Sequence, residues 1–180
     1  MSAMVQRIVD AHGDHVLRKS AVRIRDGAEI FERVLAGKGY GTVLEIGSFR
    51  GVSAAVMSQY CAQVVTVDLK HGDLEQHAIA LDRRAFWQSL GVDNVELFLV
   101  ADDIEKAALI SSLAFDFAFI DAGKDDIATD FALVKRCGRV LFHDYDDRGQ
   151  PSLNMVYDFV NSLPKEQVTV MDIFALWEAA

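Results

Sequence analysis

The sequence predicts an α/β fold with a doubly wound, mostly parallel sheet whose two faces are covered by helices. Two observations lead to this prediction. Short apolar runs typical of buried strands alternate with helical patterns, and the first apolar run ends in a glycine turn that leads into a helix. Repeated strand-helix-strand units imply parallel strands joined by right-handed crossovers. Ligands of such sheets bind at the carboxyl ends of the strands.

The size of the chain indicates one domain. Its 180 residues, 51% of them hydrophobic, can build a substantial core. Residues 1–36 are expected to form an N-terminal helical segment packed on the domain, because Ile30, Phe31, Val34 and Leu35 make one apolar stripe at helical spacing. Residues 37–180 are expected to contain the sheet.

The first predicted strand is the apolar run Val43–Ile46. Gly47 follows it, where the lack of a Cβ permits a sharp turn and a close approach of a ligand to the backbone. Gly51 should let the helix predicted over residues 52–60 begin tightly against the sheet. The second strand ends at Asp68, about 17 residues after Gly51, where an acid can accept hydrogen bonds from ribose hydroxyls.

The alternation of strands and helices continues to the C-terminus. A helix over residues 74–90 is predicted to end at Gly91, in the position of a C-cap. The elements expected after it are a strand over 95–100, a helix over 104–112, a strand over 115–120, a helix over 127–136, a strand over 139–142, a helix over 152–163, and two closing strands over 167–171 and 173–178.

Five candidate functional residues fall at the carboxyl ends of predicted strands: Gly47, Asp68, Asp102, Asp121 and Asp144. A single aspartate at such a place means little, because aspartate favours turns and helix caps. Four aspartates and a glycine together, at the edge where ligands collect, favour a functional site.

The composition excludes several classes of partner. A formal net charge of −9 argues against a nucleic-acid backbone or an anionic membrane as the main partner. Cys61 and Cys137 lack the spacing of a metal site or a disulfide framework. The N-terminus has no uninterrupted apolar stretch typical of a secretion signal, and no apolar run reaches membrane length. We therefore expect a cytoplasmic protein that contacts neither nucleic acid nor membrane.

The glycine spacing separates two kinds of cofactor. A dinucleotide site requires G-x-G-x-x-G, whose second glycine lets the backbone approach a pyrophosphate. Here Ser48, Phe49 and Arg50 lie between Gly47 and Gly51. A pyrophosphate is therefore not expected, although a strand-turn-helix with incidental glycines is an alternative reading of this stretch.

The chain resembles the class I S-adenosylmethionine-dependent methyltransferases. The E-x-G-x-x-x-G arrangement of residues 45–51 with the later Asp68 is similar to their first motif, and residues 45–53 and 142–145 resemble the group called methyltransferase domain 24. Residues 119–125 also resemble a motif of catechol and caffeoyl-CoA O-methyltransferases. The resemblance spans about residues 28–180 and implies a Rossmann-like, seven-stranded sheet.

The resemblance also implies a site for S-adenosylmethionine. Gly47, Ser48 and Gly51 would line its methionine end, Asp68 would bind the ribose diol, and Asp102 would accept from the adenine amino group. The hydroxyl of Ser53 could reach the cofactor carboxylate. The full set of expected cofactor-binding residues is Glu45, Gly47, Ser48, Gly51, Ser53, Asp68, Leu69, Asp102, Asp103 and Asp121.

The resemblance to catechol O-methyltransferases, here called the catechol type, suggests the catalytic residues. In these enzymes a metal binds an acid after the fourth strand and an Asp-Asn pair after the fifth. Asp121 and Asp144 match two of these metal ligands, but Tyr145 replaces the asparagine. Asp146 or a water could complete a magnesium site, since hard cations accept such oxygens. Lys124 and His143 are the two candidates for the base, with Asp144 orienting or coordinating.

The leading hypothesis is a methyltransferase that acts on a small-molecule acceptor, with oxygen as the preferred atom. It requires positioning of the acceptor in line with the methyl group and help with proton loss. Two alternatives stay open: a non-catalytic cofactor-binding or assembly module on the same fold, and a nucleotide-dependent oxidoreductase. The acceptor and the oligomeric state, including a homodimer, cannot be read from the sequence.

Overall fold

The computed structural model describes residues 2–18, 24–70, 82–145 and 154–180. In this part of the chain a seven-stranded sheet has the order β3-β2-β1-β4-β5-β7-β6. The strands are β1 (Thr42–Ile46), β2 (Gln63–Leu69), β3 (Val95–Val100), β4 (Phe117–Ile120), β5 (Arg139–Phe142), β6 (Val168–Met171) and β7 (Phe174–Glu178). Neighbours among β1 to β5 pair in parallel, whereas β7 pairs antiparallel with β5 and β6. The predicted fold class is confirmed.

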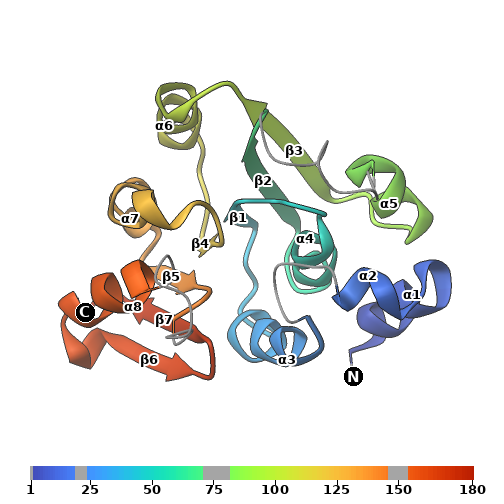
Figure 1. The fold of residues 1–180 in the computed structure, drawn as a ribbon, viewed down its shortest axis with the longest axis horizontal. Helices are drawn as coiled ribbons and strands as arrows, with labels where there is room; N and C mark the ends of the chain where they lie inside the picture. The colour runs from blue at the N-terminus through green and yellow to red at the C-terminus, as the bar shows by residue number, and fades with distance from the viewer. Residues whose placement is uncertain (1, 19–23, 71–81, 146–153) are drawn as a thin grey trace.

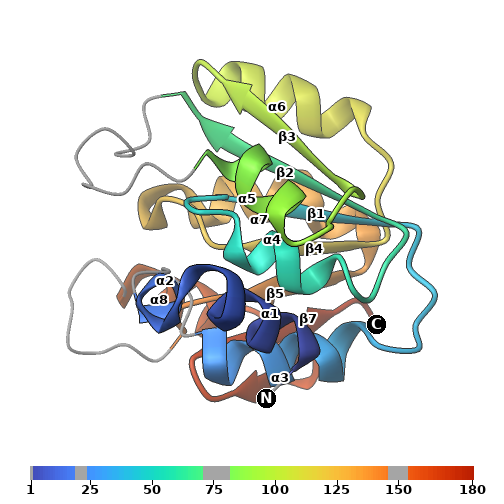
Figure 2. The same ribbon diagram turned by 90° about the vertical axis from the view of Figure 1, so that its right-hand side faces the viewer.

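Helices cover both faces of the sheet (Figure 1). On one face lie α1 (Ala3–His12), α2 (Asp14–Arg18), α3 (Ile24–Leu35), α4 (Val52–Met57) and α5 (Arg83–Ser89), and on the other lie α6 (Asp103–Ser112), α7 (Ile127–Val134) and α8 (Asn154–Ser162). Figure 2 shows α4 and α5 on the near side of the sheet and α7 beyond it. None of the described helices is both long and apolar enough to cross a bilayer.

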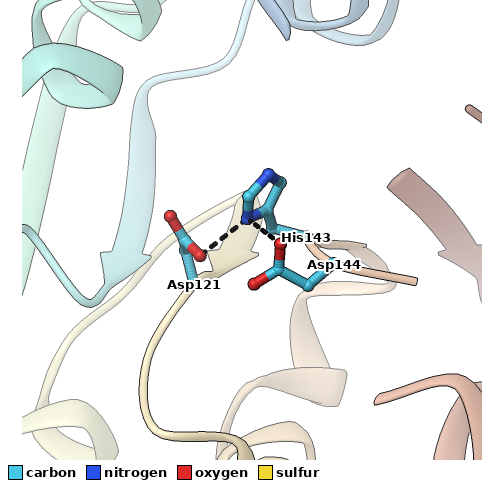
Figure 3. A group of neighbouring side chains, drawn as sticks. All are labelled: Asp121, His143 and Asp144. Atoms are coloured by element: carbon cyan, nitrogen blue, oxygen red, sulfur yellow. Dashed lines mark hydrogen bonds and ion pairs between the residues drawn. The ribbon is translucent and has the colours of Figure 1, made fainter. Parts of the chain in front are cut away.

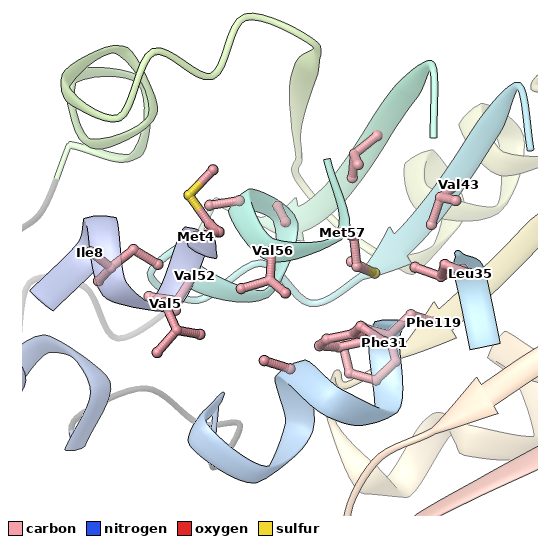
Figure 4. Packing of buried hydrophobic residues seen from close by; sticks show 14 of the residues in the cluster. Met4, Val5, Ile8, Phe31, Leu35, Val43, Val52, Val56, Met57 and Phe119 are labelled. Atoms are coloured by element: carbon pink, nitrogen blue, oxygen red, sulfur yellow. The ribbon is translucent and has the colours of Figure 1, made fainter. Parts of the chain in front are cut away.

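The N-terminal helices share a hydrophobic core with one face of the sheet. Met4, Val5 and Ile8 of α1 are buried in the same cluster as residues of α3, α4 and β1 (Figure 4). The ring of Phe31 on α3 meets that of Phe119 on β4 edge-on, with 5.0 Å between the centroids. Burial of aromatic surface of this size is a large contribution to packing, so α3 is held against the middle of the sheet.

Three predicted boundaries were wrong by a few residues. The helix expected to reach residue 60 ends at Met57, and the strand expected from residue 115 begins at Phe117. Asp116 lies before the strand, where its carboxylate accepts hydrogen bonds from the backbone N–H groups of Gly41 and Thr42. The helix expected over 127–136 ends at Val134 and tightens into a 3₁₀ turn.

The helix predicted over residues 74–90 falls partly outside the described residues. Its described part, α5, begins at Arg83 after Asp82, whose side chain accepts from the N–H groups of Arg84 and Ala85. Aspartate satisfies otherwise unpaired N–H groups at a helix start, which explains this boundary. The predicted glycine cap is close to the observed end, since Gly91 follows at φ +62°.

Candidate functional site

The carboxyl ends of the three central strands lie side by side. The N–H of Gly47 donates to Val67 on β2, and the N–H of Asp121 donates to Ile46 on β1, both at 2.9 Å. The N–H of His143 donates to Ile120 on β4 at 3.1 Å. The ladder of hydrogen bonds thus continues past the strand ends and brings the predicted residues after β1, β4 and β5 together.

Asp68 and Asp102 lie on the same edge of the sheet, because β2 and β3 are parallel neighbours and Asp68 is opposite Leu99. Both carboxylates already have partners. Asp68 Oδ2 lies 2.6 Å from Nη1 of the buried Arg83. Asp102 is the N-cap of α6 and accepts from the N–H of Glu105 at 2.8 Å. These acids therefore have a structural role in addition to any contact with a ligand.

Two further predicted cofactor residues, Leu69 and Asp103, lie at the surface beside these acids. Leu69 is partly exposed at the end of β2. Asp103 forms an ion pair with Lys106 at 2.8 Å, and Lys106 lies at the same distance from the fully buried Asp130. Lys106 thereby links α6 to α7, so Asp103 belongs to a structural ion-pair network.

Both glycines of the turn are required by neighbouring protein atoms. Gly47 has φ +92°, and a Cβ there would lie 2.5 Å from the carbonyl oxygen of Asp121. The first reason for Gly47 is therefore the close approach of the β4 end, where the sequence suggested a ligand. Gly51 has φ +74°, and a Cβ there would meet the indole of Trp87 at 2.7 Å. Gly51 thus packs against α5, whereas contact with the sheet was expected.

Glu45 and Ser53 form a buried pair beneath this turn. Glu45 is fully buried, and the Ser53 hydroxyl donates to its Oε1. Burial raises the pKa of Glu45 to about 8, although the Ser53 hydroxyl opposes the shift. Ser53 therefore directs its proton to Glu45, where the sequence suggested that the hydroxyl reaches a cofactor carboxylate.

The turn itself contains buried polar groups without partners. Ser48 is 2% exposed and its Oγ has no hydrogen bond. Arg50 is 4% exposed, and its Nε and Nη1 are buried and unpaired. The guanidinium lies 5.2 Å from the ring centroid of Phe49. Such a contact contributes about 0.5–2 kcal/mol, which is less than the several kcal/mol that burial of an unpaired charge costs.

Asp121, His143 and Asp144 form the most concentrated group of titratable side chains at this edge (Figure 3). His143 Nδ1 lies 2.9 Å from Asp121 Oδ1 and 3.1 Å from Asp144 Oδ1. The ring is 1% exposed. Burial lowers the pKa of His143, but the hydrogen bonds and charges of the two carboxylates outweigh it and raise this pKa to about 9.

The second ring nitrogen of His143, Nε2, has no hydrogen-bond partner. This nitrogen is buried and points away from both carboxylates (Figure 3). The ring centroid lies 5.0 Å from that of Phe174 on β7, so one side of the imidazole is packed. An imidazole oriented through one nitrogen by carboxylates, with the other nitrogen unpaired, is the arrangement of a general base.

The same three residues could hold a divalent cation. One ligand atom from each of Asp121, His143 and Asp144 lies within 4.8 Å of the others. Two carboxylate oxygens and one imidazole nitrogen suit manganese, iron or zinc as well as magnesium, which prefers oxygen ligands. Asp144 has φ +61°, a strained conformation for a non-glycine residue that aims its side chain into this group.

Lys124, Tyr145 and Asp146 are the remaining residues that the sequence connected with catalysis or with a metal. Lys124 begins the 3₁₀ turn Lys124–Asp126, but its side chain lies outside the described residues, as does Asp146. Tyr145, which stands where the catechol type has asparagine, donates its hydroxyl to Asn161 on α8 at 3.3 Å. Its ring also contacts that of Tyr157, with centroids 5.2 Å apart. Tyr145 therefore anchors α8.

Three residues at this edge were missed by the sequence reasoning: Arg50, Arg83 and Trp87. The indole Nε1 of Trp87 donates to the carbonyl of Gly51 at 2.8 Å, and Arg83 pairs with Asp68. Residues 83 and 87 are four apart on a helix that the sequence did predict, so they share one face. That spacing was the signal that could have placed both against the turn and Asp68.

The buried Glu45 makes stability depend on pH. In the folded chain this carboxyl keeps its proton up to about pH 8, whereas its ordinary pKa is 4.5. The folded state therefore binds the proton more tightly, and its stability falls as pH rises from 4.5 to 8, by at most about 1.4 kcal/mol per pH unit. Glu45→Gln removes this loss. The free energy of unfolding of the variant, relative to that of the wild type, should therefore increase as pH rises.

Urea unfolding of both proteins at pH 5 and pH 8 measures this effect. The exposed Glu29→Gln serves as the control, with a constant difference from wild type. Parallel stability curves for wild type and Glu45→Gln would contradict the burial of a protonated carboxyl at this position.

Comparisons with known proteins agree with this fold. An O-methyltransferase from Bacillus cereus in complex with S-adenosylhomocysteine is 15% identical, with 99% of this chain and 92% of that chain covered and a TM-score of 0.69. An O-methyltransferase of tomaymycin synthesis from Streptomyces achromogenes, in complex with S-adenosylmethionine, is 17% identical. The match covers 100% of this chain and 91% of that chain, with a TM-score of 0.67. A Staphylococcus aureus protein assigned as a caffeoyl-CoA O-methyltransferase is 14% identical. The match covers 100% of this chain and 93% of that chain, with a TM-score of 0.73.

At these identities the solved structures show the fold alone. No curated protein sequence matches the chain. A family model described as a methyltransferase domain, number 24 of that series, matches residues 44–145, which is more than half of the chain and runs from β1 to the end of the Asp121, His143 and Asp144 group. The chain therefore belongs to this methyltransferase domain family, as its sequence motifs suggested.

Proposed function

We propose that the protein transfers a methyl group from S-adenosylmethionine to a hydroxyl oxygen of a small molecule. The observation that carries the proposal is the meeting of the Gly47 turn with Asp121 and His143 at one edge of the sheet. Membership in the methyltransferase domain family supports it, as do the names of the O-methyltransferases of similar fold.

The cofactor would lie along the carboxyl ends of β1, β2 and β3. When bound, it supplies a methyl group that is already electrophilic. Its methionine end would lie against the turn from Gly47 to Gly51, its ribose on Asp68, and its adenine beside Asp102. Since Asp68 is held by Arg83 at 2.6 Å, the carboxylate is oriented before a ribose arrives. Pre-orientation of this kind lowers the entropy lost on binding.

We propose that Nε2 of His143 accepts the proton of the acceptor hydroxyl as the oxygen attacks the methyl carbon. Asp121 and Asp144 hold the ring through Nδ1 and stabilise the positive charge that it gains. With a pKa of about 9, the imidazole is mostly protonated at neutral pH, so its minor neutral form is the base. That form has a proton affinity close to that of a phenolate, whose pKa is about 10. Proton transfer from a phenol is then nearly balanced. Lys124 is the second candidate for this role.

A divalent cation is a second way to activate the acceptor at the same place. Magnesium would take one oxygen each from Asp121 and Asp144 and complete its shell with water, or with His143 Nδ1. A bound cation would lower the pKa of an acceptor hydroxyl directly. The cation and the protonated His143 compete for the same carboxylate oxygens, so the two routes are alternatives.

Two other functions compete with methyl transfer. A non-catalytic module would bind the cofactor without turnover, and the replacement of the expected asparagine by Tyr145 leaves this possible. A nucleotide-dependent oxidoreductase is disfavoured because the turn lacks the middle glycine, and a titration with reduced nicotinamide cofactor would reveal it. We further expect the chain to act in the cytoplasm, where its free Cys61 and Cys137 stay reduced.

Calorimetry with S-adenosylhomocysteine tests the cofactor site. Asp68→Ala should lower the affinity at least about tenfold, because two hydrogen bonds to a charged group are lost. Asp93→Ala, an exposed acid near the same helix, is the matched control and should bind like wild type. Since Arg83 loses its partner in Asp68→Ala, melting curves must first establish that the variant is folded. No binding of the compound to wild type would remove the proposed function.

Methyl transfer to a panel of small phenols, beginning with catechol, tests the base. His143→Gln should lower kcat by about 10²- to 10⁴-fold and leave the affinity for S-adenosylhomocysteine within about threefold, because the ring is assigned to the acceptor. Lys124→Met distinguishes the other candidate. The assay is repeated in EDTA. Turnover that is lost in EDTA and restored by magnesium would assign Asp121 and Asp144 to a cation, and wild-type kcat in His143→Gln would contradict the base.

A further inference from the structure

Arg50 is a buried cation without an anion. It lies in the turn between β1 and α4, is 4% exposed, and has two buried guanidinium nitrogens without a hydrogen bond. None of the ion pairs among the described residues includes it, and the ring of Phe49 is its charge-stabilising contact. Buried charges in proteins are normally paired, so this one points to a partner that binds from outside the chain.

Glu45, the acidic residue nearest to Arg50 in the sequence, does not supply that partner. Glu45 is fully buried, but its Oε1 accepts from Ser53 and its Oε2 has no partner. The Oγ of Ser48, two residues before Arg50, is also buried and has no hydrogen-bond partner. The turn therefore presents a guanidinium and a hydroxyl that together lack an acceptor.

The chemistry of these groups selects the class of ligand. A guanidinium presents its N–H groups in a planar fork that matches the two oxygens of a carboxylate. A pyrophosphate is disfavoured, because the turn has Phe49 where a second glycine would be needed for the backbone to approach it. A carboxylate on a small organic molecule fits both the donor geometry and the side chains of the turn.

We propose that Arg50 binds a carboxylate group of a small molecule held at this turn. The inference rests on the proposed function, which brings two molecules to this edge. The carboxylate belongs either to the methionine end of the cofactor or to the methyl acceptor. Arg50 is then a specificity residue, whose charge is neutralised only when that molecule is bound.

The first arm of the test uses the cofactor product. Calorimetry compares wild type, Arg50→Met and Arg50→Lys with S-adenosylhomocysteine and with S-adenosyl-3-thiopropylamine, which lacks the carboxylate. If the cofactor is the source, Arg50→Met lowers the affinity for S-adenosylhomocysteine about 30-fold or more and leaves that for the analogue unchanged. Arg50→Lys restores part of the loss, because it keeps the charge without the fork. Arg84→Met, an exposed arginine on α5, is the control.

The second arm uses the acceptor side. In protein saturated with S-adenosylhomocysteine, binding of 3,4-dihydroxybenzoate and of catechol is followed by NMR titration. These probes differ by one carboxylate. If the acceptor is the source, Arg50→Met binds S-adenosylhomocysteine like wild type but loses the preference for dihydroxybenzoate over catechol.

Stability without ligand gives an independent check. Replacing an unpaired buried charge by an apolar side chain of similar length is neutral or stabilising, so Arg50→Met should melt at or above the wild-type temperature. A melting temperature several degrees lower would show a structural partner and overturn the proposal. Equal affinities of wild type and Arg50→Met for all four compounds would also overturn it. If wild type binds S-adenosylhomocysteine in that case, the proposed function survives, whereas no binding to wild type would remove both.

Discussion

The backbone of Gly47 lies so close to the end of β4 that no side chain fits between them. A Cβ at this position would be 2.5 Å from the carbonyl oxygen of Asp121, and the N–H of Asp121 donates to Ile46 one residue before the glycine. This contact sets the turn after β1 directly beside the acid after β4. Because β5 pairs with β4, His143 follows Asp121 into the same place. The positions of Asp121 and His143 relative to the turn depend on that approach.

Around this contact the protein buries polar groups that its own residues do not satisfy. Glu45 Oε2, Ser48 Oγ, two nitrogens of Arg50 and Nε2 of His143 are all buried and unpaired. Native proteins leave few such groups, and each calls for an explanation. Elsewhere in the described part of the chain a buried charge such as Lys106 has its partner, in Asp130. Buried atoms without a hydrogen bond also occur at Thr66, Asp130 and Arg139, but five of the nine such atoms in the described residues lie around this contact. Such groups are what a site prepared for a polar ligand requires.

Local patterns in the sequence predicted the sheet well. The apolar runs of β1, β3 and β5 and the position of Gly47 follow from rules that act over a few residues, and the parallel order places Asp68, Asp102, Asp121 and Asp144 on one edge. The pairing of Asp68 with Arg83, which lies 15 residues later, was not predicted, although the helical spacing of Arg83 and Trp87 was a signal for it. The contact of His143 with Asp144 was also not predicted, because Asp144 has a left-handed backbone that local preference opposes.

We propose that the carboxyl edge from β3 to β5 is one site, arranged around an adenosyl cofactor. A crystal structure of the chain with S-adenosylhomocysteine tests this most directly. We expect the homocysteine end to lie against the turn of Gly47 and the ribose hydroxyls to lie within hydrogen-bond distance of Asp68. The sulfur should face the side of the site that holds His143 Nε2. Density for the compound at another face of the sheet, or an Asp68 that contacts Arg83 alone while the compound is bound, would contradict it.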